Sequence, residues 1–179
     1  MDTIVINDDN LNDNNIHKFG NKVRAILLSD DKILVSHYGG VILLPGGSID
    51  KGENIEDAII RELQEETGII YDLNQLKYLL TIKYYQLNYL TRNNEYINRL
   101  MTTHYYLGHF NGIDLNNIKR TEKEIKDNFN LELISFDDLL SQSDFSDNPR
   151  KKYFDRENKE IIKVLKTYKE YNLNEYKYN

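Results

Sequence analysis

The stretch GGSIDKGENIEDAIIRELQEETGI, from Gly46 to Ile69, places Glu62, Glu65 and Glu66 within about one helical turn. On a wheel of about 100° per residue with Glu62 at zero, the apolar residues spread from about −40° to about 100°. Glu66 falls at about 40°, inside this apolar face, while Glu62 lies at its edge and Glu65 beside it. Ordinary solvated glutamates would lie opposite the isoleucines, so this helix is not a simple surface helix.

A positively charged group is needed to offset the repulsion among these neighbouring carboxylates. Glu62 and Glu66 form an i,i+4 pair of like charges, which destabilises a helix by a few tenths of a kcal/mol, and carboxylates beside apolar residues also lose hydration. Arg61 is one candidate partner and a divalent metal ion is the other. Carboxylate oxygens without cysteine suit Mg²⁺ or Mn²⁺, and Mg²⁺ commonly binds substrate phosphates as well. The pattern therefore indicates a metal site that holds a phosphate or pyrophosphate group.

The residues around the helix agree with a phosphate-binding loop. Gly46, Gly47 and Gly52 allow a close approach of the backbone to a ligand or a positive φ. Asn54 is suited to cap the first turn, and Gly68 is suited to end the last. These signals predict a loop followed by a helix over about 54–67.

The rest of the chain predicts a mixed β-sheet with helices on its faces. Expected strands cover 3–6, 23–28, 32–36, 41–44, 76–89, 100–110 and 131–136, and expected helices cover 137–143 and 151–171. Residues 7–15 are rich in Asn and Asp, and 111–130 form a long polar connection of a kind that is often functional. We expect one α/β domain over 1–179, with a short strand and polar segment in 1–16 and a C-terminal helix and tail in 151–179.

Composition narrows the class of protein. The formal net charge is −6 with a pI near 5.3, which argues against a protein that wraps nucleic acid through charge alone. The chain has no cysteine, and its first residues lack the basic start and long apolar run of a signal peptide. Its apolar runs are too short to cross a bilayer. We therefore expect a cytoplasmic protein with no membrane segment.

A family resemblance emerges from the same stretch. Gly47, five residues, Glu53, seven residues and then Arg61 to Ile69 (RELQEETGI) match every position of the Nudix box, G-x5-E-x7-R-E-U-x-E-E-x-G-U, where U is aliphatic. The match covers Gly47 to Ile69 and is highly specific. The resemblance is looser outside the box, where Leu44-Pro45-Gly46 and the segment 135–139 look like the family's lead-in and late strand-to-helix segments.

The resemblance implies a Nudix α/β/α sandwich and a role for each residue of the box. Glu62, Glu65 and Glu66 would bind Mg²⁺ or Mn²⁺, and the backbone carbonyl of Gly47 would add a ligand. Arg61 and Glu53 would orient these glutamates. Family members often add a carboxylate from the loop before the last strand, where this chain has Glu122, Glu124 and Asp127. Glu124 and Asp127 are the favoured candidates for this additional carboxylate, and Glu124 is the one included among the expected metal ligands.

Residues that read the substrate are harder to identify. His37 and Tyr38 end a strand and could face the pocket, and Tyr85 is one of several strand tyrosines that could stack on a base. For tyrosines 84, 85, 105 and 106, core packing is the favoured interpretation of each residue taken singly.

The resemblance implies a pyrophosphohydrolase that cleaves a nucleoside diphosphate linked to another moiety. The substrate stays open among nucleoside triphosphates, dinucleoside polyphosphates, nucleotide sugars or ADP-ribose, and a 5′ end of RNA, although the acidic charge argues against long RNA contacts. The alternative is a Nudix domain that senses a nucleotide without hydrolysing it, and the complete set of box carboxylates disfavours it. The family is often dimeric, so a homodimer is a further expectation.

Overall fold

The computed structural model describes residues 2–38, 40–91, 93–119, 129–141 and 149–172. Its elements are the strands β1 (Thr3–Ile6), β2 (Lys18–Ser29), β3 (Lys32–Tyr38), β4 (Val41–Leu43), β5 (Leu76–Leu90), β6 (Tyr96–His109) and β7 (Asn130–Ser135), and the helices α1 (Ile55–Thr67), α3 (Phe136–Ser141) and α4 (Lys151–Asn172). Two short 3₁₀ turns lie at Asp13–Asn15 and Leu73–Gln75.

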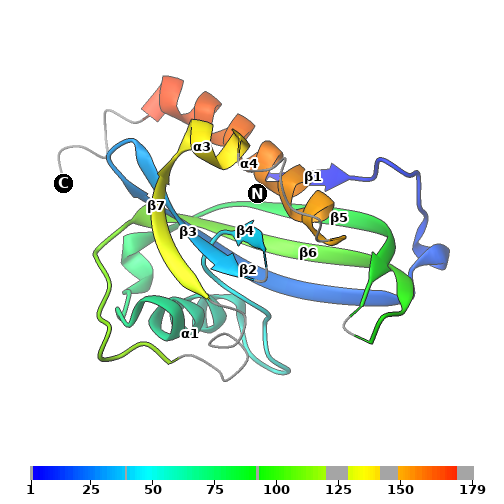
Figure 1. Cartoon of the computed structure of the whole chain (residues 1–179), viewed down its shortest axis with the longest axis horizontal. Coiled ribbons are helices and arrows are strands. Elements are labelled where there is room, and N and C mark those ends of the chain that lie inside the picture. Colours follow the sequence, from blue (N-terminus) through cyan, green and yellow to red (C-terminus); the bar gives the residue numbers. More distant parts are fainter. Residues whose placement is uncertain (1, 39, 92, 120–128, 142–148, 173–179) are drawn as a thin grey trace.

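One mixed sheet of seven strands organises the molecule. The strand order is β1-β5-β6-β2-β3-β4, and β7 pairs with β3. Helix α1 lies on one face of the sheet, and α3 and α4 lie on the other (Figure 1). The expected α/β/α sandwich with a mixed sheet is confirmed.

Alternation along β2 gives each face of the sheet its own core. Val23, Ala25 and Leu27 are fully buried and pack in the cluster that contains the apolar residues of α1. Ile26 points to the opposite face and packs in the cluster that contains Ile161 of α4. Because successive side chains of a strand point to opposite faces, Arg24 and Lys22 share the α4 face with Ile26.

Two strands begin earlier than the hydropathy pattern predicts. Strand β2 starts at Lys18 because its parallel ladder with β6 runs from the pair Lys18–Arg99 to the pair Leu28–His109. Strand β6 starts at Tyr96, which pairs with Leu90 of β5. The expected starts at 23 and 100 were wrong because backbone hydrogen bonds continue through polar residues, which an apolar pattern does not mark.

The loop before α1 lies directly against β2. The backbone N–H of Val23 donates to Gly47 O at 3.0 Å, and that of Ala25 donates to Pro45 O at 2.8 Å. Strand β3 pairs with β2 only at their shared turn, which leaves this edge of β2 to the loop. Gly46 has φ +128°, and a Cβ there would lie 2.3 Å from Val23 O, so the close approach requires glycine.

In the ranges described above, no helix is both long and apolar enough to cross a membrane.

Candidate active site

Helix α1 begins and ends as its sequence predicts. The side chain of Asn54 accepts a hydrogen bond from the backbone N–H of Asp57 at 2.7 Å, which caps the first turn. Gly68 ends the helix in the left-handed conformation with φ 75°. A Cβ at Gly68 would lie 2.1 Å from the carbonyl oxygen of Asp114, so the segment after β6 packs against this end of the helix.

The glutamates of α1 follow the order of burial that the helical wheel predicts. Glu66 is only 9% exposed. The side chain of Glu62 is 14% exposed, whereas that of Glu65 is 39% exposed. The two carboxylates closest to the apolar face are therefore also those that lose most of their hydration.

Arg61 holds the carboxylates of this region together. Its Nε donates to Glu53 Oε1 at 2.7 Å and its Nη2 to Glu53 Oε2 at 2.9 Å, a bidentate pair. Its Nη1 donates to Glu62 Oε1 at 2.9 Å and, more weakly, to Glu65 Oε2 at 3.4 Å. The hydrogen bonds from Arg61 lower the pKa of Glu53 from its ordinary 4.5 to about 2, so Glu53 is ionised at neutral pH.

Glu62 and Glu66 each lie against the glycine loop. Loss of hydration raises the pKa of Glu62, and Arg61 opposes this shift only in part. A Cβ at Gly47 would lie 2.4 Å from Glu62 Oε1, so a glycine is needed for the carboxylate to approach the loop. Glu66 Oε2 accepts a hydrogen bond from the backbone N–H of Gly46 at 3.1 Å.

The donor set suits a hard divalent cation, although its carboxylates are engaged by Arg61 and by the glycine loop. Within the described ranges, no three acidic or histidine side chains converge as a preformed metal cluster. Arg61 holds Glu62 and Glu65, and the loop holds Glu66. Three carboxylates on adjacent turns beside backbone carbonyls still supply the oxygen ligands that Mg²⁺ and Mn²⁺ prefer.

The predicted metal-binding roles, including those of Glu62, Glu65 and Glu66, all stay predictions. The carbonyl of Gly47 accepts the N–H of Val23, and a carbonyl oxygen has a second lone pair for another partner. Glu124, like its alternatives Glu122 and Asp127, lies outside the described residues. The segment that leads to them is anchored on α1, because the N–H of Asp114 donates to Thr67 O at 2.8 Å and that of Lys119 to Glu65 O at 2.9 Å.

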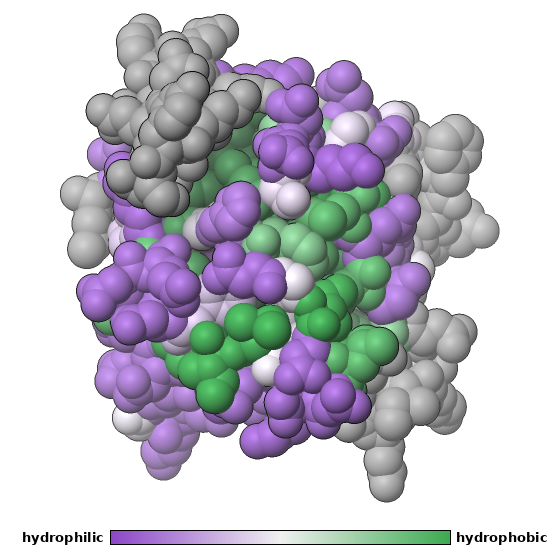
Figure 2. All heavy atoms as spheres, turned by 90° about the vertical axis from the view of Figure 1, so that its left-hand side faces the viewer, coloured by the Kyte–Doolittle hydropathy of each residue, from purple (hydrophilic) through white to green (hydrophobic). Residues whose placement is uncertain are grey.

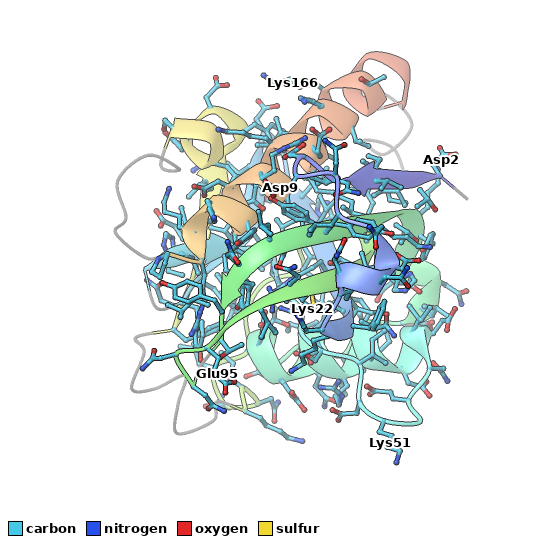
Figure 3. All side chains as sticks on the ribbon, turned by 90° about the vertical axis from the view of Figure 1, so that its right-hand side faces the viewer. Asp2, Asp9, Lys22, Lys51, Glu95 and Lys166 are labelled. Carbon is cyan, nitrogen blue, oxygen red and sulfur yellow. The ribbon has the colours of Figure 1, made fainter. Side chains whose placement is uncertain are left out.

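A narrow cleft opens between the sheet and α4, next to the glycine loop. Residues of β2, β4, β6 and α4 and the residue after β4 line it: Lys22, Arg24, Leu43, Leu44, Thr103, Tyr105, Phe154, Glu157 and Asn158. The guanidinium of Arg24 joins the cleft to the box, because it donates to the carbonyls of Leu44 and Gly46. In the view of Figure 3, half-buried Lys22 lies near the centre of the projection, whereas exposed Lys51 of the glycine loop lies at its lower edge.

Apart from Tyr105, one of the strand tyrosines considered for stacking on a base, the residues of the cleft were not singled out from the sequence. One signal was available, since Lys22 and Arg24 alternate with Val23 and Ala25 at the start of an apolar strand. A buried arginine at such a position is unusual, because arginine is rarely buried without partners. Nothing in the local pattern around Glu157 or Asn158 separates them from other polar residues of a surface helix.

The three residues proposed to read the substrate lie elsewhere. His37 Nε2 and Glu132 Oε2 are 2.9 Å apart on neighbouring strands, and the Tyr85 hydroxyl donates to Asp13 at 2.9 Å. None of His37, Tyr38 and Tyr85 lines the cleft, and their role in binding stays a prediction. The structure buries tyrosines 84, 105 and 106, so core packing is confirmed for them.

Two curated proteins resemble part of this chain in sequence. The curated ADP-ribose pyrophosphatase of Methanocaldococcus jannaschii is 39% identical over 59 residues, which are 30% of this chain and 35% of that protein. The 8-oxo-dGTP diphosphatase of Proteus vulgaris is 47% identical over 49 residues, 27% of this chain and 42% of that protein. This chain thus spans less than half the length of either relative.

The fold also matches solved structures. A MutT protein from Bacillus halodurans superposes with a TM-score of 0.52 at 18% identity, over 80% of this chain and 82% of that one. The family model of the NUDIX domain matches residues 18–157, which is more than half of the chain. The box, the sandwich around it and this match agree, and the chain belongs to the NUDIX domain family.

Proposed function

We propose that this protein hydrolyses the pyrophosphate bond of a nucleoside diphosphate linked to another moiety, with Mg²⁺ or Mn²⁺ as cofactor. The observation that carries the proposal is the placement of Glu62 and Glu66 against the glycine loop, directly beside a cleft with two cationic side chains. A carboxylate site for a metal ion next to basic groups suits a bound pyrophosphate.

Each residue of the box has a task in this proposal. Glu62, Glu65 and Glu66 would hold the metal ion, which supplies Lewis acidity and lowers the pKa of a bound water. Arg61 and Glu53 orient the glutamates, because the bidentate pair fixes the guanidinium that contacts Glu62 and Glu65. The carboxylate that accepts the proton of the attacking water is one of these glutamates or one from the segment that contains Glu124.

The cleft supports a nucleotide as the substrate. Lys22 and Arg24 would neutralise phosphate oxygens, and Phe154 offers an aromatic surface for a base or sugar. The cavity volume is about 20 Å³, whereas ligand pockets usually measure about 300 Å³ or more. Substrate entry therefore requires side chains of the cleft or α4 to move outward.

The second candidate function is nucleotide sensing without hydrolysis. A sensor has no need of the full set of metal-binding carboxylates, and this chain has all of them together with Arg61 and Glu53. The complete set favours the enzyme.

A panel assay separates the two functions. The purified protein is incubated with Mg²⁺ or Mn²⁺ and a nucleoside triphosphate, a dinucleoside polyphosphate, ADP-ribose, 8-oxo-dGTP and a 5′-triphosphorylated RNA, and nucleotide products are separated by chromatography. We expect hydrolysis of at least one compound, abolished by EDTA. Tight binding of one compound without turnover of any would establish the sensor instead.

The expected homodimer stays a prediction. Exposed apolar side chains gather on the end of the molecule shown in Figure 2, and the large ones near the end of α1 include Ile70 and Leu115, which are 70% and 76% exposed. Such a patch is compatible with the expected homodimer. The cytoplasmic location also stays a prediction.

A further inference from the structure

One acidic side chain of α4 points into the cleft and is held there by the sheet. The hydroxyl of Tyr105 donates to Glu157 Oε1 at 2.6 Å. Tyr105 is only 2% exposed, so its ring is fixed by the core and its hydroxyl is a rigid donor. The carboxylate of Glu157 therefore has a defined position in the cleft rather than that of a mobile surface group.

Glu157 differs from its acidic neighbours on the same helix. Asp155 pairs with Lys151 at 2.7 Å, and Glu160 pairs with Arg156 and Lys163. Among the residues that the structure describes, Glu157 forms no ion pair, and Tyr105 is its hydrogen-bond partner. A carboxylate has two oxygens with several acceptor positions, and its one hydrogen bond to Tyr105 leaves the others available for a ligand.

The order of charges along the cleft determines which part of a nucleotide meets Glu157. Arg24 bonds to the glycine loop through Gly46, and in the parallel ladder Arg24 lies opposite Tyr105. Arg24 thus lies between the glycine loop before α1 and Tyr105, the residue that holds Glu157. Phosphates would lie between the box and the cations, because Glu157 repels them. The nucleoside, which is uncharged and rich in donors, would lie at Glu157.

We propose that Glu157 is a specificity-determining residue that accepts hydrogen bonds from adjacent N–H or O–H donors of the nucleoside. Two groups have this chemistry: the N1–H and C2 amino group of guanine, and the 2′,3′-diol of ribose. Tyr105 is a positioning residue that keeps the carboxylate in place. The inference rests on the proposed function, since it assumes that the cleft holds the nucleotide.

Binding of nucleoside monophosphates tests the inference without any turnover. The probes are GMP, IMP, which lacks the C2 amino group, dGMP, which lacks the 2′-hydroxyl, and inorganic phosphate, each titrated by calorimetry without metal. Glu157→Gln keeps the shape of the side chain but replaces one acceptor oxygen by a donor. We expect it to weaken GMP binding about 10- to 100-fold, as for the loss of hydrogen bonds to a charged group.

The direction of this effect is diagnostic. Removing a negative charge near a phosphate site should otherwise strengthen the binding of every anion, so inorganic phosphate should bind Glu157→Gln equally or more tightly. If guanine is the group that is read, wild-type protein binds IMP more weakly than GMP, and the variant loses this difference. If the ribose is read, dGMP shows that behaviour instead.

Two further variants serve as comparisons. Glu160→Gln makes the same change on the same helix outside the cleft and should leave GMP binding unchanged. Tyr105→Phe should weaken GMP binding by a smaller factor than Glu157→Gln, because the carboxylate remains but is no longer held. The inference is wrong if wild-type protein binds none of the three nucleotides, or if Glu157→Gln binds GMP as tightly as wild type while remaining folded. In either case the panel assay still judges the proposed function separately.

Discussion

The box and the cleft adjoin each other and differ in how the chain builds them. The box lies within one continuous stretch, and α1 places Glu62, Glu65 and Glu66 by its period alone. The cleft combines β2, β6 and α4, so that Arg24, Tyr105 and Glu157 come from distant parts of the sequence. Under the proposed function, the groups for the reaction would be local in the sequence, whereas the groups for recognition would depend on the tertiary fold. A family can therefore keep one box while its clefts diverge.

The largest expected effect comes from the buried glutamate of the box. Glu66→Gln keeps an oxygen that can accept the N–H of Gly46, so the fold should persist with a near-unchanged melting temperature. It removes a charged oxygen from a proposed metal ligand, and we expect kcat with Mg²⁺ to fall at least about 100-fold, as when an enzyme loses one main electrostatic group. Steady-state kinetics and a thermal melt measure both quantities. Wild-type activity in this variant would contradict the metal assignment.

A second prediction concerns the contact between the loop and α1. In Gly47→Ala the new Cβ would lie 2.4 Å from Glu62 Oε1, so the flexible carboxylate should be displaced. We expect kcat/KM to fall about 10- to 100-fold, the usual range when the orientation of a metal ligand is disturbed. Gly52→Ala is the matched control, because Gly52 has φ +85° with open space around it. It should lower stability by about 1 kcal/mol and leave kcat/KM unchanged.

A substitution in the cleft should change KM, whereas substitutions in the box should change kcat. Lys22→Ala removes one cation that lines the cleft, and we expect KM for a nucleotide substrate to rise about 10-fold, in line with the loss of one charge-assisted hydrogen bond. The value of kcat should change little, since the carboxylates of the box are untouched. A fall in kcat at constant KM would show that Lys22 acts in the reaction, and the division between the two regions would not hold.

The smallest expected effect is a change in the pH dependence of stability. Arg61 lowers the pKa of Glu53 to about 2 from 4.5, so the folded state binds this proton less readily than the unfolded chain. The contribution of the pair is fully present above about pH 4.5 and is lost as the pH falls toward 2. Urea unfolding between these values should show a shallower dependence on pH for Glu53→Gln than for wild type. Parallel curves would mean that the pair contributes nothing to stability.

The same contrast explains how much of the structure could be predicted from the sequence. The caps at Asn54 and Gly68 and the burial of Glu66 follow from local rules, and all were predicted correctly. The cleft could not be predicted, because the bond between Tyr105 and Glu157 joins residues 52 positions apart. For His37, the sequence predicted the position in the strand but not the partner of the side chain. His37 ends a strand as predicted, and its partner is Glu132 of β7 rather than a group of the cleft.

The anchor between α1 and the segment after β6 has a consequence for protein engineering. The N–H groups of Asp114 and Lys119 bond to carbonyls in the last turns of α1. Residues added or deleted between these two positions would change the distance that the chain must span and would strain the end of the helix. Residues added directly after Lys119 leave both bonds intact. A loop grafted from another member of the family, or an inserted reporter peptide, is therefore best joined after Lys119.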